Sequence, residues 1–154
     1  MPDESGCMID RNGSPQDLER FVDAQHGVYE TAIAELRAGS KQSHWMWFIF
    51  PQIAGLGRSA TARFFAITDL DEARAYLAHP ALGARLAECT EAMAAWSGKR
   101  SAESILGSVD ALKFASSMTL FEAAGGGDRF ERALDGFCDG ERDRRTLDIL
   151  AGAA

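Results

Sequence analysis

One segment of the sequence decides the fold: Lys41-Gln42-Ser43-His44-Trp45-Met46-Trp47-Phe48-Ile49-Phe50-Pro51-Gln52. It lies in a window from Gly39 to Thr68 that contains no Asp or Glu, although the whole chain has a net charge of −7. Three basic residues in this window, Lys41, Arg58 and Arg63, therefore have no acidic neighbour in sequence. Because a local excess of cations attracts negative charge, we expect an anion that binds this protein to bind here.

The apolar run from Trp45 to Phe50 is too short for its pattern to distinguish a strand from a helix. We predict a short helix or turn, because a single strand would leave backbone groups unpaired in an otherwise helical domain. Consecutive aromatic residues cannot all face the core from one helix. At least one of Trp45 and Trp47 is therefore expected to face a cleft or a partner.

Upstream of this segment, the sequence predicts one long helix. Apolar residues recur at steps of three and four from Leu18 to Leu36, which is the spacing of one helix face. Ser14-Pro15 is typical of a helix start, and Gly39 is typical of a helix end. Residues 1–13 show no periodicity, so we expect a flexible N-terminal arm there.

Downstream, capping residues and helix breakers divide the chain into further helices. Ser59 and Asp69 are typical N-caps, and His79-Pro80 interrupts the apolar pattern. Predicted helices cover about 59–67, 69–79, 82–96, two stretches between 101 and 121, 128–137 and 143–150. No segment alternates apolar and polar residues as a strand would. The sequence therefore predicts an all-α, compact multihelical bundle that forms a single domain over residues 14–154.

The overall composition is that of an ordinary globular protein. The chain has 154 residues, of which 46% are hydrophobic and 25% are charged, and this fits one domain. The negative net charge argues against nucleic acid or a membrane surface as partners, because both require a large basic face. No apolar run approaches the roughly 20 residues that span a bilayer. We expect a soluble, cytoplasmic protein.

The residue types that bind metals are scattered. The cysteines, Cys7, Cys89 and Cys138, lack the C-x-x-C spacing of zinc or redox sites. The three histidines do not share a helical turn. We therefore predict reduced thiols, no metal site and no cofactor.

Several motifs resemble those of a bacterial domain-of-unknown-function family, DUF1810, whose members are sometimes labelled calpastatin-like. The resemblance covers about residues 17–150, and its most distinctive motifs are Ser43-His44-Trp45-Met46-Trp47-Phe48-Ile49-Phe50-Pro51-Gln52, Gly55-Leu56-Gly57, Ala75-Tyr76-Leu77-Ala78-His79-Pro80 and Ser116-Ser117-Met118-Thr119-Leu120-Phe121. It implies a compact multihelical single domain and brings no established activity. One departure is Gly39-Ser40-Lys41, where the family pattern often has Gly-Arg-Lys. A phosphate site that used that arginine would be weaker here.

His44 is the best candidate for a catalytic residue. An unperturbed imidazole exchanges a proton near neutral pH, so His44 is suited to general base catalysis or to hydrogen bonding with a substrate. The alternative is a structural histidine that ties its loop to a helix. This alternative is favoured by the absence of a nearby acid in sequence that would orient the ring.

Two further groups of residues are candidates for anion binding. Gly55-Leu56-Gly57-Arg58-Ser59 leads into a Ser-capped helix, whose exposed N–H groups suit a phosphate or carboxylate. The alternative is a plain connector in which Ser59 only caps the helix. Lys113 lies one helical turn before Ser116 and Ser117, and could complete an anion pocket from across the fold. The alternative is that these side chains face solvent or cap backbone carbonyls. Gln25 lies on an apolar face and needs a partner, which Gln52 or a ligand could supply, although hydrogen bonding within the core is the favoured role.

Two functions of different classes follow from these patterns. The preferred one is a pocket for an anionic, nucleotide-like small molecule. Its candidate ligand-binding residues are Lys41, Ser43, His44, Trp47, Gln52, Arg58, Ser59 and Lys113. The alternative is a protein–protein interaction module that uses an exposed tryptophan patch. Whether the protein is an enzyme is left open by the sequence.

Overall fold

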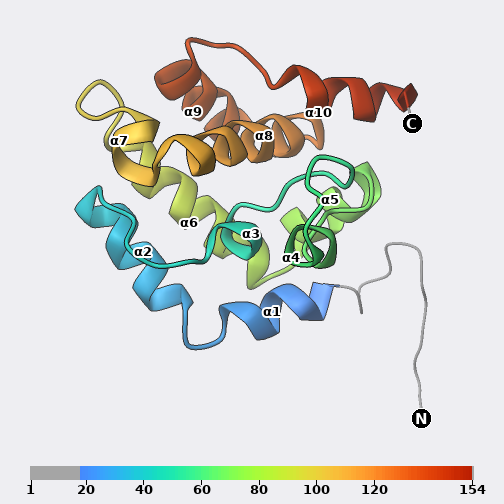
Figure 1. Ribbon diagram of the computed structural model, residues 1–154, viewed down its shortest axis with the longest axis horizontal. Helices are drawn as coiled ribbons and strands as arrows, with labels where there is room; N and C mark the ends of the chain where they lie inside the picture. Colours follow the sequence, from blue (N-terminus) through green and yellow to red (C-terminus); the bar gives the residue numbers. More distant parts are fainter. Residues whose placement is uncertain (1–17, 154) are drawn as a thin grey trace.

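Helices make up the regular structure of the computed structural model, which describes residues 18–153 (Figure 1). They are α1 Glu19–Gln25, α2 Tyr29–Ala38, α3 Met46–Ile49, α4 Ala60–Phe64, α5 Leu70–Ala78, α6 Leu82–Ala94, α7 Ala102–Leu106, α8 Ser108–Ala123, α9 Asp128–Cys138 and α10 Arg144–Asp148, followed by a π-helical turn, Ile149–Ala153. Within this range the only β pairing is a single bridge between Ile53 and Ile67. The prediction of a compact, all-α single-domain fold is confirmed. The expected arm at 1–13 and the Ser14-Pro15 helix start lie outside the described residues.

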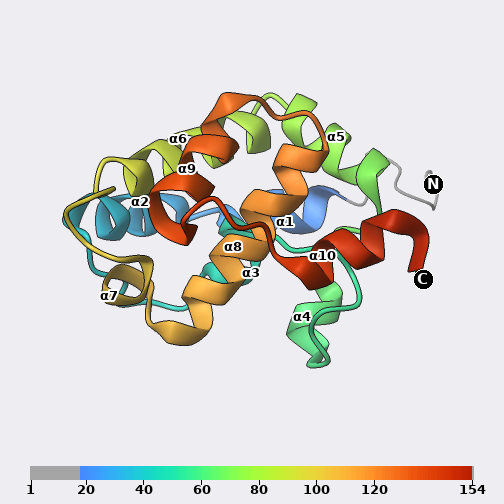
Figure 2. The same ribbon diagram turned by 90° about the horizontal axis from the view of Figure 1, so that it is seen from above.

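The longest helix, α8, lies at the centre of the bundle. Residues 116–121 are buried on every side of α8, which is typical of a helix inside a bundle, whereas the first turns are partly exposed. It packs against α5, α7, α9 and α10. Figure 2 shows α8 running across the middle of the molecule, with α2 and α6 toward one end and α4 and α10 toward the other. No helix in residues 18–153 is long and apolar enough to cross a membrane.

The aromatic segment from Trp45 to Phe50 contains the short helix α3, and its buried rings anchor α3 in the core. Trp45 and Phe50, which flank α3, are fully buried. The ring of Phe50 meets the ring of Phe114 on α8 edge-on, with 5.1 Å between ring centroids. The preference for a short helix over a strand is therefore confirmed, and the buried rings fix α3 against the central helix.

The predicted single helix from Leu18 to Leu36 is wrong, because the chain breaks at residues 26–28. Gly27 adopts a left-handed conformation with φ of +75°, and α2 then starts in a new direction. The apolar periodicity crosses the break because α1 and α2 both bury one face in the same core. Gly39 ends α2 with φ of +73°, as the sequence predicted.

Further along the chain, the predicted N-caps are confirmed. The side chains of Ser59 and Asp69 accept hydrogen bonds from Ala62 N and Glu72 N, which starts α4 and α5. The break at His79-Pro80 ends α5. The predicted limits differ from the observed ones at several helix ends: α4 ends at Phe64 and not at Ile67, α6 ends at Ala94 and not at Trp96, and α8 continues to Ala123.

Gln25 is the polar centre of the contacts between α1, α3, α5 and α6. Its amide nitrogen donates to the carbonyl of Phe48 at 2.8 Å and to the hydroxyl of Tyr76 at 3.2 Å. Its amide oxygen accepts from Arg85 at 3.1 Å. The expectation that Gln25 needs a partner is confirmed, but these partners are core groups and not Gln52 or a ligand.

Candidate functional site

Glu35 fixes the start of the acid-free window from the neighbouring helix α2. Its carboxylate accepts hydrogen bonds from Ser43 N at 3.0 Å, Ser43 Oγ at 2.7 Å and Trp45 Nε1 at 2.9 Å, and also from Gln42 N at 2.9 Å. Burial alone would raise the pKa of Glu35, but these hydrogen bonds lower it to about 2. The window therefore contains no acid in its sequence, but the carboxylate of Glu35 contacts it in the folded protein.

Asp110 of α8 is the second acid that reaches this window. Lys41 Nζ lies 2.9 Å from Asp110 Oδ2, and the Lys41 side chain is only 8% exposed. The same ammonium lies 5.1 Å from the centroid of the Trp45 ring. Asp110 Oδ1 also lies 3.4 Å from Lys113 Nζ. Because Lys41 is buried and paired, its charge is largely compensated before any ligand arrives.

Beside these residues lies a hollow of about 390 Å³, which we call the Trp47 hollow. It lies between the loop after α3, the first half of α8 and the start of α10. The residues that line it are Trp47, Gln52, Leu56, Gly57, Ala62, Val109, Leu112, Lys113, Ser116, Asp143 and Arg145. Its volume is within the roughly 300–1,000 Å³ range of small-molecule sites.

Two cations and an indole give the Trp47 hollow its chemical character. Lys113 Nζ lies 4.3 Å from the centroid of the Trp47 ring, a distance suited to a cation–π contact. Arg145, on the exposed side, donates to the carbonyl of Leu56 at 3.4 Å. The hollow therefore combines a flat apolar surface with positive charge.

The wall formed by α8 and α10 is held by hydrogen bonds. Asp143 Oδ2 accepts from Ser116 Oγ at 3.1 Å and from Thr146 Oγ1 at 2.6 Å. The backbone N–H of Asp143 donates to Thr119 Oγ1 at 2.9 Å. No histidine is found among the described residues that line the hollow, and the Ser116 hydroxyl is directed at the Asp143 carboxylate and the carbonyl of Leu112.

The structure gathers some of the predicted site residues and separates the others. Trp47, Gln52 and Lys113 line the same hollow, and Lys41 reaches it through Asp110. The other four predicted residues neither line it nor reach it through Asp110. Ser43 is held by Glu35, His44 and Arg58 are exposed, and Ser59 caps α4. Their role in ligand binding stays a prediction.

Sequence reasoning missed the acids of the site and one of its cations. Asp110 had a readable signal, since it lies three residues before Lys113 and such pairs meet on a helix face. Glu35 and Arg145 had none, because both come from helices that only the tertiary fold brings to the window. Leu56 and Arg145 are 89 residues apart in sequence.

Residues that bind metals remain dispersed in the folded chain. Among residues 18–153 no group of three or more His, Cys, Asp or Glu side chains is placed to hold a metal ion. Cys89 is buried and Cys138 is partly buried, and neither forms a disulfide. Burial raises the pKa of Cys89 to about 12, so this thiol is essentially protonated at neutral pH.

Comparisons with known proteins agree with this fold. The chain belongs to the family described as "Protein of unknown function (DUF1810)", whose model matches residues 15–150. Among solved structures, it is similar to the crystal structure of the conserved hypothetical protein Rv1873 from Mycobacterium tuberculosis, with 49% sequence identity and a TM-score of 0.86. The similarity covers 90% of this chain and 99% of that chain. No match was found among the curated proteins.

Proposed function

We propose that the Trp47 hollow binds a small molecule that joins a flat ring to an anionic group, as a nucleotide does. The observation that carries the proposal is the position of the Lys113 ammonium over the Trp47 ring inside a hollow of suitable volume. A ring of the ligand would stack in the space beside the indole. Its anionic group would replace water around the ammonium of Lys113 and the guanidinium of Arg145.

The electrostatics of the hollow support an anion more than a cation. Lys113 shares Asp110 with Lys41, and its own distance to that carboxylate is the longer one, 3.4 Å against 2.9 Å. One carboxylate therefore faces two ammonium groups. Asp143, the acid that lines the hollow, already accepts hydrogen bonds from Ser116 and Thr146. A negatively charged ligand would offset the remaining positive charge.

A thermal-shift screen against nucleotides and phosphorylated metabolites tests this function. A ligand at 100 times its Kd should stabilise the folded protein by about 2.7 kcal/mol. Calorimetric titration of the best hit should then show binding weakened about tenfold or more in Lys113→Ala and in Trp47→Ala. Arg74→Ala, which removes an exposed cation of α5 that does not line the hollow, is the matched control and should bind normally. Equal affinities in all four proteins would contradict the proposal.

A second candidate function is a docking surface for another protein. It is favoured by two apolar side chains of α8 on the rim of the Trp47 hollow, Val109 and Leu112, which are 65% and 71% exposed. Exposed apolar side chains grouped beside a tryptophan are typical of interaction sites. If this function is correct, Leu112→Asp and Trp47→Ala should abolish capture of a partner, while the ligand screen finds nothing. We also propose a cytoplasmic location, because the cysteines are expected to be reduced thiols.

A further inference from the structure

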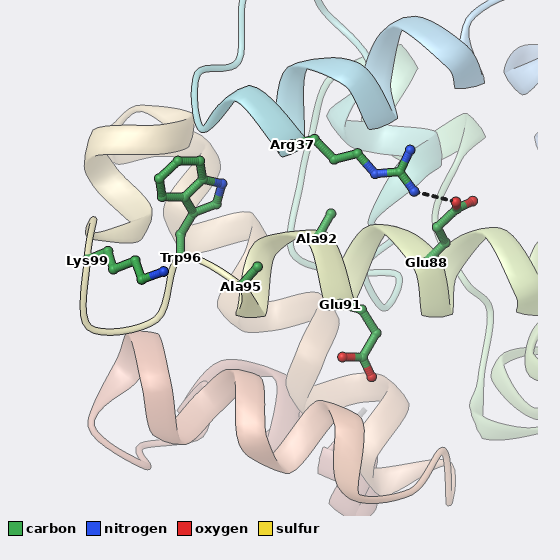
Figure 3. A pocket seen from close by; sticks show the side chains of 7 residues that line it. All are labelled: Arg37, Glu88, Glu91, Ala92, Ala95, Trp96 and Lys99. Atoms are coloured by element: carbon green, nitrogen blue, oxygen red, sulfur yellow. Dashed lines mark hydrogen bonds and ion pairs between the residues drawn. The ribbon is translucent and has the colours of Figure 1, made fainter.

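A second hollow, of about 430 Å³, lies between α2 and α6 and was not anticipated from the sequence. Figure 3 shows its main features: Ala92 on α6 and Ala95 directly after this helix form the floor, Trp96 closes one end, and Arg37 reaches over from α2. Lys99 lies beside Trp96. We call this second hollow the Trp96 hollow. It is at the α2 and α6 end of the molecule, away from α4 and α10 (Figure 2).

The indole of Trp96 is fixed in place. Its Nε1 donates to the carbonyl of Leu36 at 3.0 Å. Gly39 packs so closely against the ring that a Cβ atom there would lie 2.9 Å from Trp96 Cε2. The indole is therefore held rigidly, and a ligand would lose little free energy in ordering it.

The two acids of the Trp96 hollow are already paired with cations. Glu88 accepts from Arg37 at 2.7 Å and from the Tyr29 hydroxyl. Glu91 accepts from two arginines of α9, Arg129 at 2.9 Å and Arg132 at 3.2 Å. Neither carboxylate is thus left to repel an incoming anion at full strength.

The cations around the Trp96 hollow differ from these acids in that one of them is unpaired within the described part of the chain. Lys99 is exposed and has no ion pair with an acid of residues 18–153. The guanidinium of Arg100 lies 5.9 Å from the centroid of the Trp96 ring. The lining itself holds two cations, Arg37 and Lys99, and the two carboxylates. Because both carboxylates are already paired and Lys99 has no acidic partner among the described residues, the uncompensated charge at this hollow is positive, which favours an anion in a chain with a net charge of −7.

We propose that the Trp96 hollow is a separate binding site for a planar aromatic anion. The ring of the ligand would lie on the methyl groups of Ala92 and Ala95 with its edge against the Trp96 indole. Its acidic group would bind Lys99, the cation without an acidic partner. The volume of about 430 Å³ accommodates a ligand of this size. The proposal does not depend on the function of the Trp47 hollow.

Titration with naphthalene-2-sulfonate, followed by NMR of the tryptophan indole N–H groups, tests this site. Trp47 and Trp96 line the two different hollows, so their signals distinguish binding at either one. We expect a saturable shift of the Trp96 signal. Lys99→Ala should weaken the binding reported by the Trp96 signal about three- to tenfold, and Lys113→Ala should leave the Trp96 titration unchanged. The neutral analogue naphthalene-2-methanol should bind more weakly than the sulfonate.

A steric variant makes the test independent of charge. Ala95→Phe adds a ring at an exposed position directly after α6, which should fill the hollow and abolish the shift without loss of the fold. An unchanged thermal melting curve would verify that each variant is folded. The proposal is overturned if the Trp96 signal does not shift saturably, if only the Trp47 signal shifts, or if Ala95→Phe and Lys99→Ala both bind the sulfonate as tightly as the natural protein.

Discussion

Glu35 is the residue on which the conformation of the 40–45 loop depends most directly. A carboxylate that accepts several hydrogen bonds is stabilised in its charged form, because each donor is oriented toward negative charge. Ser43 and Trp45 each donate to it, and Trp45 is fully buried. Loss of the carboxylate would leave these donors without an acceptor in a partly buried place.

We expect the contribution of Glu35 to stability to depend on pH. Its folded pKa of about 2 lies below the usual value of 4.5. A lowered pKa means that the stabilisation is complete above about pH 4.5 and is lost as the pH falls toward 2. Glu35→Gln should therefore lower the free energy of unfolding by about 2 kcal/mol at neutral pH. The gap between the two proteins should narrow on acidification.

Urea denaturation at several pH values between about 3 and 7 measures this gap. Glu30→Gln is the matched control, because Glu30 is an exposed acid on the same helix. It should change the free energy of unfolding by less than about 1 kcal/mol. A gap for Glu35→Gln that stays constant over the whole pH range would show that the carboxylate is not the stabilising group.

At the scale of elements, two glycines with the same backbone conformation punctuate the N-terminal helices. Gly27 separates α1 from α2, and Gly39 ends α2, with φ values of +75° and +73°. Their surroundings differ. A Cβ atom at Gly27 would meet no atom within 4 Å, whereas a Cβ atom at Gly39 would press on the ring of Trp96. The pair therefore separates backbone strain from a packing clash.

We expect Gly27→Ala to lower the free energy of unfolding by about 1–2 kcal/mol, the usual cost of a left-handed residue with a side chain. Gly39→Ala should cost about 1–3 kcal/mol more, because the ring of Trp96 must also move. Urea denaturation measures both, and Trp96 fluorescence should change only in Gly39→Ala. If the two variants were equally destabilised, the contact between Gly39 and Trp96 would be too loose to matter.

At the scale of the whole molecule, one continuous apolar core joins the helices. It extends from Leu18 in front of α1 to Leu134 in α9. Since no helix has a core of its own, the protein should unfold in a single cooperative transition. Helix content followed by circular dichroism and the burial of Trp45 followed by fluorescence should give the same midpoint in urea. Two separated midpoints would mean that part of the bundle unfolds independently.

The elements that the sequence predicted well are those set by local chemistry. Ser59 and Asp69 cap helices with their own side chains, and Gly39 supplies a backbone conformation that other residues avoid. The break at Gly27 was missed for a physical reason. Apolar spacing reports which side chains face the core, and it does not report a change in helix direction when both helices face the same core.

The candidate site was only partly predictable. Trp47, Gln52 and Lys113 could be named from their residue types, and they do share a hollow. The distribution of charge could not be read in the same way. The acid-free window describes distance along the chain, while Glu35 and Asp110 approach it through space from α2 and α8. The Trp96 hollow is likewise lined by residues of both α2 and α6. The residue spacing within either helix does not predict it.

The contacts of Gln25 have a consequence for the uniqueness of this fold. Four segments meet at one amide, which presents its donor side to Phe48 and Tyr76 and its acceptor side to Arg85. If α1 slid by one turn, these groups would lose their partners inside the core, at a cost of about 1–3 kcal/mol for each. Apolar contacts alone tolerate such a slide far better. The hydrogen bonds of the Gln25 amide therefore favour one alignment of the helices over alternatives in which α1 is shifted by a turn.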